Sequence, residues 1–124
     1  MRIRPERVAQ AMRREIADIL VNELRDPRID AFVSITDVIV TKDLSFAKVY
    51  VSMLKDGVER EHAMEALQHA VPFIRRLLAP RMGLREMPDM RFMLDTSIER
   101  GARVDELLRK IKDGEPIPED DQQG

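Results

Sequence analysis

The sequence contains no cysteine and no tryptophan, and it has one tyrosine and four phenylalanines. Without cysteine the chain can form neither a disulfide nor a thiolate metal site, and it has no cysteine nucleophile. No apolar run approaches the roughly 18 residues of a membrane-spanning helix. The first ten residues, MRIRPERVAQ, contain no apolar signal region. We therefore expect a cytoplasmic protein with no membrane partner.

Patterns that carry catalysis or bind cofactors are also lacking. There is no phosphate-binding loop, no dinucleotide-binding glycine motif and no nucleophile elbow. His62 and His69 lie seven residues apart, which is not a metal-binding spacing, and Ser97 is better explained as a helix cap than as a nucleophile. Glu15 and Asp18 share a helix face, where exposed acids are ordinary. We expect no enzymatic activity, no metal, no cofactor and no small-molecule substrate.

Charge is distributed unevenly along the chain. The net charge is −2, from 21 basic and 23 acidic residues, but residues 113–124 contain five acids and no base. Residues 1–112 therefore have a net charge of +3. Five arginines and one acid lie in residues 1–14, and five arginines and two acids lie in residues 72–91. Such clustering, more than the total charge, favours the binding of a polyanion.

Hydrophobic periodicity predicts most of the secondary structure. It favours a helix over residues 4–25, strands over 33–41, 46–53 and 90–95, and a last helix that runs to about 112. Residues 42–45 are short enough to join the first two strands as an antiparallel hairpin. In residues 33–41 the apolar side chains fall in both alternating phases, which indicates a strand covered on much of both faces and is compatible with an irregularity.

The segment from Glu59 to Pro88 has the pattern of one helix that is interrupted and resumed. Apolar residues recur at helical spacing on both sides of Pro72. Proline inside a helix costs about 3 kcal/mol, whereas the first turn of a new helix accepts it. We therefore predict two short helices joined by a kink at Ala70, Val71 and Pro72.

These elements predict one domain of the α+β class. Three strands cannot bury both faces against each other, so the economical solution is a three-stranded sheet with helices packed on one face. Residues 113–124 contain prolines and acids and little to bury, so we expect an acidic disordered tail. The domain is then formed by residues 1–112.

Arginines concentrate after the predicted kink. Arg75, Arg76, Arg81 and Arg85 lie within eleven residues, and no acid lies between the first and the last of them. A helix that begins at a kink also presents free N–H groups and the positive end of its dipole to an anion. The pattern is compatible with a solvated arginine face and with a phosphate-contacting surface.

Four stretches that cover nearly the whole expected domain resemble a known family. They are RVAQAMRREIADILVNELRDPR at 7–28, ITDVIVTKDLSFAKVYVSML at 35–54, FIRRLLAPRMGLREMPDMRF at 73–92 and SIERGARVDELLRKI at 97–111. Together, and in this order, they resemble the ribosome-binding factor A family of bacteria and plastids.

The resemblance implies a KH-like domain of the type II topology, with the order α-β-β-α-kink-α-β-α. It also implies a non-catalytic cytoplasmic assembly factor, which we expect to be a monomer. Such a factor binds the free small (30S) ribosomal subunit, assists late maturation and 5′-end processing of 16S rRNA, and matters most in the cold. The implied partners are the small subunit and its 16S rRNA.

The resemblance also implies a basic RNA-facing surface. Family members have Ala-x-Gly at the kink instead of the GxxG phosphate clamp of ordinary KH domains, and the proline in this chain removes one N–H donor there. The RNA-facing positions correspond to Arg75, Arg76, Arg81 and Arg85, with Lys42, Lys48, Arg4 and Arg7 as further candidates.

Two other hypotheses remain at this stage. One is a generic KH module for single-stranded RNA, and the other is a protein-interaction domain whose arginines only solvate it. Stacking on unpaired bases needs exposed aromatic rings, and only Tyr50 and Phe46 could share an outer strand face. Phosphate recognition by arginine therefore fits the sequence better.

Overall fold

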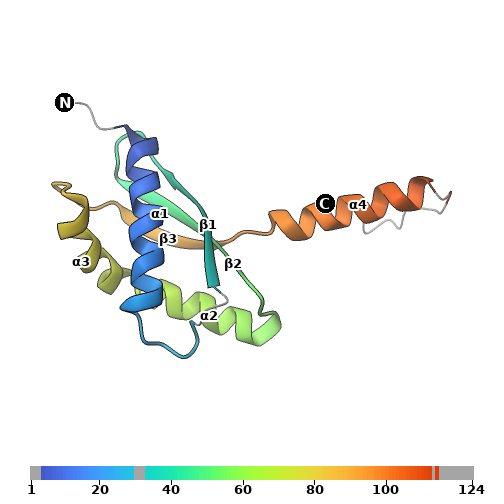
Figure 1. Cartoon of the computed structure of the whole chain (residues 1–124), viewed down its shortest axis with the longest axis horizontal. Helices are drawn as coiled ribbons and strands as arrows, with labels where there is room; N and C mark the ends of the chain where they lie inside the picture. Colours follow the sequence, from blue (N-terminus) through green and yellow to red (C-terminus); the bar gives the residue numbers. More distant parts are fainter. Residues whose placement is uncertain (1–3, 30–32, 113, 115–124) are drawn as a thin grey trace. The chain divides into compact units, whose positions relative to one another are not determined.

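The computed structural model describes residues 4–29, 33–112 and 114, with the backbone alone described for residues 98–104. The chain forms two compact units, Met1–Leu94 and Asp95–Gly124. The elements of the first unit are α1 (Pro5–Asn22), β1 (Val33–Val40), β2 (Phe46–Met53), α2 (Gly57–His69), α3 (Val71–Met82) and β3 (Asp89–Leu94), and the second unit contains α4 (Ser97–Lys112) (Figure 1). The predicted element order is confirmed. The domain boundary at residue 112 stays a prediction, and the predicted tail lies outside the described residues except for Gly114.

The three strands form one mixed sheet in the order β1-β2-β3. The predicted hairpin of β1 and β2 is confirmed as an antiparallel pair, while β2 and β3 are parallel. Parallel strands need a crossover connection, which α2 and α3 provide. Figure 1 shows α1 beside β1, and α1 also contacts α3, while α2 contacts β3.

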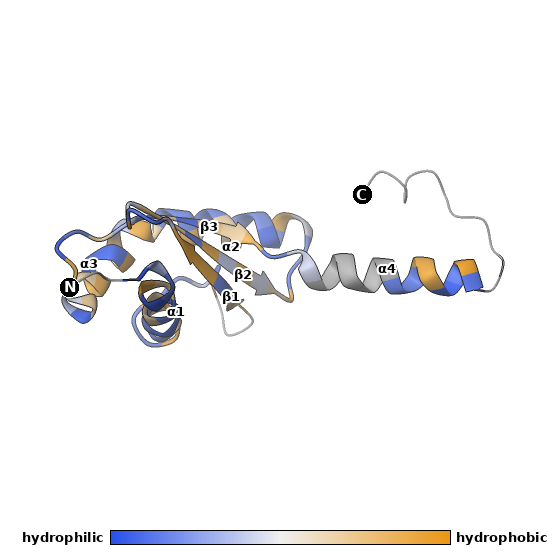
Figure 2. Cartoon of the chain, turned by 90° about the horizontal axis from the view of Figure 1, so that it is seen from above, coloured by the Kyte–Doolittle hydropathy of each residue, from blue (hydrophilic) through white to orange (hydrophobic). Residues whose placement is uncertain are grey.

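The helices α1, α2 and α3 cover one face of the sheet. Along β2, Ala47, Val49 and Val51 are buried while Lys48 between them is exposed. Figure 2 shows apolar residues interspersed with hydrophilic ones along α1 and the strands. This alternation is typical of a sheet with one packed face, as the sequence predicted.

A bulge in β1 explains the mixed pattern of its sequence. The register against β2 shifts between Ile35 and Asp37, so Ile35 pairs with Val51 while Val38 pairs with Val49. The apolar residues on both sides of the bulge therefore face the helices. The prediction of a strand covered on both faces is wrong, since Ile39 on the outer face is 52% exposed. The irregularity that the pattern allowed is confirmed.

Helix α1 supplies much of the core. Met12, Ile16 and Ile19 are fully buried, in line with the predicted apolar stripe. The helix ends at Asn22, three residues before the predicted end. In the turn that follows, the Asp26 carboxylate accepts hydrogen bonds from the Arg28 backbone N–H at 2.9 Å and from Arg28 Nη2 at 2.8 Å. The hydrogen bonds from the Arg28 side chain and backbone lower the pKa of Asp26 to about 2.

The predicted break between the two middle helices falls at Ala70. Helix α2 ends at His69 and α3 begins at Val71, with Pro72 in its first turn. Ala70 has φ −81° and ψ −7°, and its carbonyl accepts the N–H of Ile74 at 2.9 Å. Because no residue of the kink has a positive φ, the bend does not require glycine and accepts proline.

Candidate nucleic-acid interface

Arg81, in the last turn of α3, is bound by two acids of α1 and lies near a third, Glu23, at the C-cap of that helix. Its Nη1 donates to Glu15 Oε2 at 3.1 Å and to Asp18 Oδ2 at 2.7 Å, and its Nη2 lies 4.0 Å from Glu23 Oε1. The hydrogen bond from Arg81 lowers the pKa of Asp18, and the hydrogen bonds to Asp18 and Glu15 raise the pKa of Arg81. Arg81 therefore ties α3 to α1.

Arg75 contacts the loop that precedes β3. Its Nε donates to the Pro88 carbonyl at 3.1 Å and its Nη2 to the Met87 carbonyl at 2.8 Å. Its Nη1 lies 3.5 Å from Asp89 Oδ1. The guanidinium thus holds the loop against α3 and satisfies two backbone acceptors. Arg75 and Arg81 point toward different neighbours, so the four arginines after the kink do not form one common surface.

The other predicted cations are exposed. Their side chains have no hydrogen-bond or ion-pair partner within the part of the chain that the structure describes. They are Arg4, Arg7, Lys42, Lys48, Arg76 and Arg85. These are the predicted site residues whose charge is available to an external ligand.

Several of these cations come from segments that meet at one end of the first unit. We call this region the hairpin end, and it consists of the first turn of α1, the turn between β1 and β2, and the loop after α3. The Asp89 N–H donates to the Ser45 carbonyl at 3.0 Å, and residues 43–45 share a hollow of about 380 Å³ with residues 86, 87 and 89. Pro5 and Glu6 of α1 line a groove with residues 38–40 of β1.

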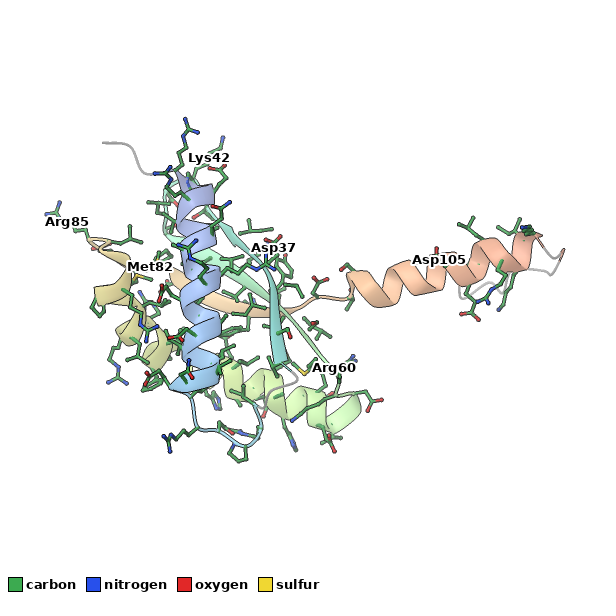
Figure 3. The ribbon with its side chains drawn as sticks, viewed as in Figure 1. Asp37, Lys42, Arg60, Met82, Arg85 and Asp105 are labelled. Carbon is green, nitrogen blue, oxygen red and sulfur yellow. The ribbon has the colours of Figure 1, made fainter. Side chains whose placement is uncertain are left out.

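The segments that carry Arg4, Arg7, Lys42 and Arg85 are far apart in sequence, yet they lie at the same end of the first unit. Figure 3 shows Lys42 and Arg85 projecting outward from the upper part of the first unit. Glu6, Asp43 and Glu86 also lie in this region, so its excess of positive charge is small. We infer that an anion there would be held by individual cations more than by a broad positive field.

The turn that presents Lys42 is held by its own side chains. The Asp43 carboxylate accepts hydrogen bonds from the Ser45 hydroxyl at 2.7 Å, the Thr41 hydroxyl at 2.8 Å and the Ser45 N–H at 3.1 Å. These hydrogen bonds lower the pKa of Asp43, and the bond from the Ser45 hydroxyl has the largest effect. Leu44 has φ 60°, the one positive φ at a non-glycine residue of the described chain. The backbone around Lys42 is therefore fixed by hydrogen bonds.

Lys48 lies on the outer face of the sheet, next to a cation that the sequence did not single out. Arg91 of β3 pairs in register with Lys48, and it is exposed as well. The sequence does contain a signal for Arg91, because it alternates with the apolar residues Met90 and Phe92. These two are buried, so Arg91 lies on the face of the sheet away from the helices. Its closeness to Lys48 depends on the parallel pairing of β2 with β3, which no local pattern shows.

Two further structural findings bear on the expected chemistry. His62 and His69 are both exposed on α2, and within the described residues no group of three acidic, histidine or cysteine side chains could hold a metal ion. Among the helices described here, none has the length and apolar character to cross a membrane.

Comparison with known proteins identifies close relatives in sequence. The family model described as ribosome-binding factor A matches residues 4–108. A protein of Acetivibrio thermocellus named ribosome-binding factor A is 46% identical over 120 residues, which cover 94% of this chain and 98% of that protein.

Solved structures give the same result. The crystal structure of ribosome-binding factor A from Thermus thermophilus has a TM-score of 0.65 at 26% identity and covers 74% of this chain and 97% of its own. A Thermus thermophilus ribosome-binding factor A model fitted into a cryo-EM map of a 30S–RbfA complex has a TM-score of 0.59 at 27% identity, covering 71% of this chain and 91% of its own. The predicted KH-like α+β fold is confirmed.

Proposed function

Because the chain belongs to the ribosome-binding factor A family, we propose that it is a non-catalytic assembly factor that binds the free small ribosomal subunit through 16S rRNA. The observation that supports this most strongly is its structural similarity to the Thermus thermophilus factor that was fitted into the map of a 30S–RbfA complex. In this proposal the protein acts as a cytoplasmic monomer, assists late maturation and 5′-end processing of 16S rRNA, and is needed most in the cold.

The proposal assigns RNA contacts to the cations that have no partner within the described residues. At the hairpin end these are Arg4, Arg7, Lys42 and Arg85, and Arg76 lies on α3. Arg75 and Arg81 would have to leave backbone carbonyls or carboxylates to reach a phosphate, and groups left unpaired in this way cost free energy. Their role in the proposal is to hold the helices and the loop that present the free cations.

A binding protein can favour the mature RNA fold only through a difference in affinity. If it binds two conformations of the RNA equally well, it shifts no equilibrium. Cations presented from a folded backbone supply such a difference, because phosphate positions change when the RNA refolds. Misfolded RNA helices are more stable at low temperature, so the same preference matters most in the cold.

Sedimentation with purified small subunits tests the proposal. The full chain should travel with free subunits and be released as salt rises, because phosphate contacts displace counterions. Arg85→Glu should weaken binding. It should also make the plot of log binding constant against log salt less steep, by about one for each phosphate that is no longer bound. Arg25→Glu, in the turn after α1, changes the net charge equally and is the matched control. Equal effects of both variants would contradict the assignment, and a wild-type chain that stays unbound would contradict the function.

A further inference from the structure

The outer face of the sheet carries an ordered set of side chains that the assignment above does not use as a unit. Following the strand register, Ile39, Lys48 and Arg91 form one row across the three strands. Asp37, Tyr50 and Met93 form the next row. Neighbouring strands lie about 4.8 Å apart, so Tyr50 is within reach of both Lys48 and Arg91.

The acids of this face have partners inside the protein, whereas its cations do not. The Asp37 carboxylate accepts the Val38 N–H at 2.8 Å, and Asp89 lies 3.5 Å from the guanidinium of Arg75. Within the described residues, the side chains of Lys48 and Arg91 have neither a hydrogen bond nor an ion pair. The Asp37 carboxylate keeps its negative charge at the β1 side of the face, whereas Lys48 and Arg91 place two cations without partners in the described part of the chain next to each other on β2 and β3, where a phosphate can bind.

Apolar side chains lie on part of the face around Tyr50, with Met93 next to it on β3 and Ile39 diagonally across on β1. Tyr50 and Met93 are partly exposed, and Ile39 is 52% exposed. An aromatic ring on a sheet beside cations is a platform on which an unstacked base can lie while its phosphates contact the cations. A duplex keeps its bases stacked, so it cannot use the ring in this way.

We propose that the outer face of the sheet binds an unpaired segment of RNA, with one base stacked on Tyr50 and the adjoining phosphates held by Lys48 and Arg91. The inference rests on the proposed function for the class of partner. It extends that function from phosphate contacts at the hairpin end to a second site that recognises single-stranded nucleotides. Lys42 of the first site and Lys48 and Tyr50 of the second belong to the β1–β2 hairpin, and Arg91 lies on the neighbouring strand β3.

The chain provides its own reporter for this site. It has one tyrosine and no tryptophan, so its intrinsic fluorescence comes from Tyr50. Titration of the full chain at low salt with a short, unstructured oligouridylate should quench this emission to saturation. In parallel, anisotropy of the labelled oligonucleotide should show affinity about tenfold weaker for Tyr50→Leu and near the wild-type value for Tyr50→Phe, since stacking needs the ring and not the hydroxyl.

The charges are tested by a separate variant. Lys48→Glu combined with Arg91→Glu should abolish binding of the oligonucleotide at low salt, while Arg25→Glu should leave it nearly unchanged. Tyr50 is partly exposed, and Arg25, Lys48 and Arg91 are exposed. The midpoint of thermal unfolding, followed by circular dichroism, should therefore be close to the wild-type value for each variant. An intact fold with unchanged oligonucleotide affinity in Tyr50→Leu and in the double variant would overturn the inference.

Subunit sedimentation separates this inference from the proposed function. If the wild-type chain binds subunits while the oligonucleotide leaves Tyr50 emission unchanged, the function stands and the inference fails. If the oligonucleotide leaves Tyr50 emission unchanged and Tyr50→Leu loses subunit binding, a protein of the subunit occupies the face. The inference fails in this case too. If the oligonucleotide quenches Tyr50 but the chain does not bind subunits, the inference holds and the proposed function fails.

Discussion

At the scale of single residues, the use of each arginine is decided by its three-dimensional neighbours. Arg75 and Arg76 are adjacent in sequence, yet one bonds backbone carbonyls of the α3–β3 loop and the other is exposed. The sequence identified the basic segment, but the acids that bind Arg81 lie on α1, more than sixty residues away. Charge spacing along one helix therefore cannot separate structural arginines from those available to RNA.

The pairing of Arg81 predicts a specific effect on stability. Arg81→Gln should lower the midpoint of thermal unfolding by a few degrees, because it removes the cation that links Glu15 and Asp18 of α1 to α3. The matched variant Arg76→Gln should leave the midpoint unchanged, since Arg76 has no ion-pair partner within the described residues. Calorimetry of both variants measures the difference, and equal midpoints would show that the α1–α3 ion pairs are energetically neutral.

The turn after α1 predicts a dependence of stability on pH. The pKa of Asp26 is lowered in the folded protein from 3.8 to about 2, so its contribution is complete above the unfolded value and is lost as the pH falls toward 2. Asp26→Asn should therefore be less stable than wild type at pH 7, and the difference should close between about pH 4 and pH 2. Urea unfolding at several pH values measures it, and a constant difference would contradict the ionic origin.

At the scale of helices and strands, local sequence patterns predicted where a helix ends better than they predicted which face of a strand is buried. The break at Ala70 followed from Pro72, because the first turn of a helix accepts a proline at the lowest cost in free energy. The face of β1 could not be assigned because one extra residue near Ile35 changes the phase of the alternation. A bulge has no fixed sequence signature, and it becomes visible only through the pairing with β2.

The end of α3 gives a prediction for one element boundary. Gly83 has φ 65°, and its N–H donates to the Ala79 carbonyl at 3.3 Å. A Cβ at this position would meet no atom within 4 Å, so the cost of Gly83→Ala is conformational and should be about 1–2 kcal/mol. Gly83→Asn should lose less, because asparagine tolerates the left-handed region better. Urea unfolding ranks the three proteins, and an asparagine variant as unstable as the alanine variant would contradict this explanation.

At the scale of the whole molecule, the fold was predictable and the site only in part. The alternation of apolar and polar residues in β2 and the apolar stripe of α1 determine which faces are buried. A small sheet covered by several helices then has few possible arrangements. The hairpin end was not predictable as a unit, because the segments that carry Arg4, Lys42 and Arg85 become neighbours only after β1, β2 and β3 have paired. The residue types were identified from sequence, whereas their grouping is a property of the topology.

The last twelve residues give a prediction that concerns the charge of the whole chain. Ending the chain at Lys112 removes five acids and no base, so the net charge changes from −2 to +3. The core of the described residues lies entirely before Asp95, so the stability of the first unit should be unchanged. Affinity for unrelated structured RNA should rise severalfold at low salt and return to the full-length value as screening shortens the Debye length to about 8 Å at physiological salt.

Charge and chain length are separated by a second protein of full length. In it, the five acids after Lys112 are replaced by the corresponding amides, which gives the same net charge as the shortened chain. If electrostatic repulsion restrains unspecific RNA binding, both proteins should bind unrelated RNA equally and more tightly than wild type in filter-binding assays over a range of salt. A gain in the shortened chain alone would mean that the last residues obstruct the RNA sterically. Only the electrostatic result would show that the acidic residues after Lys112 favour one RNA conformation over unrelated RNA, as the proposed function requires.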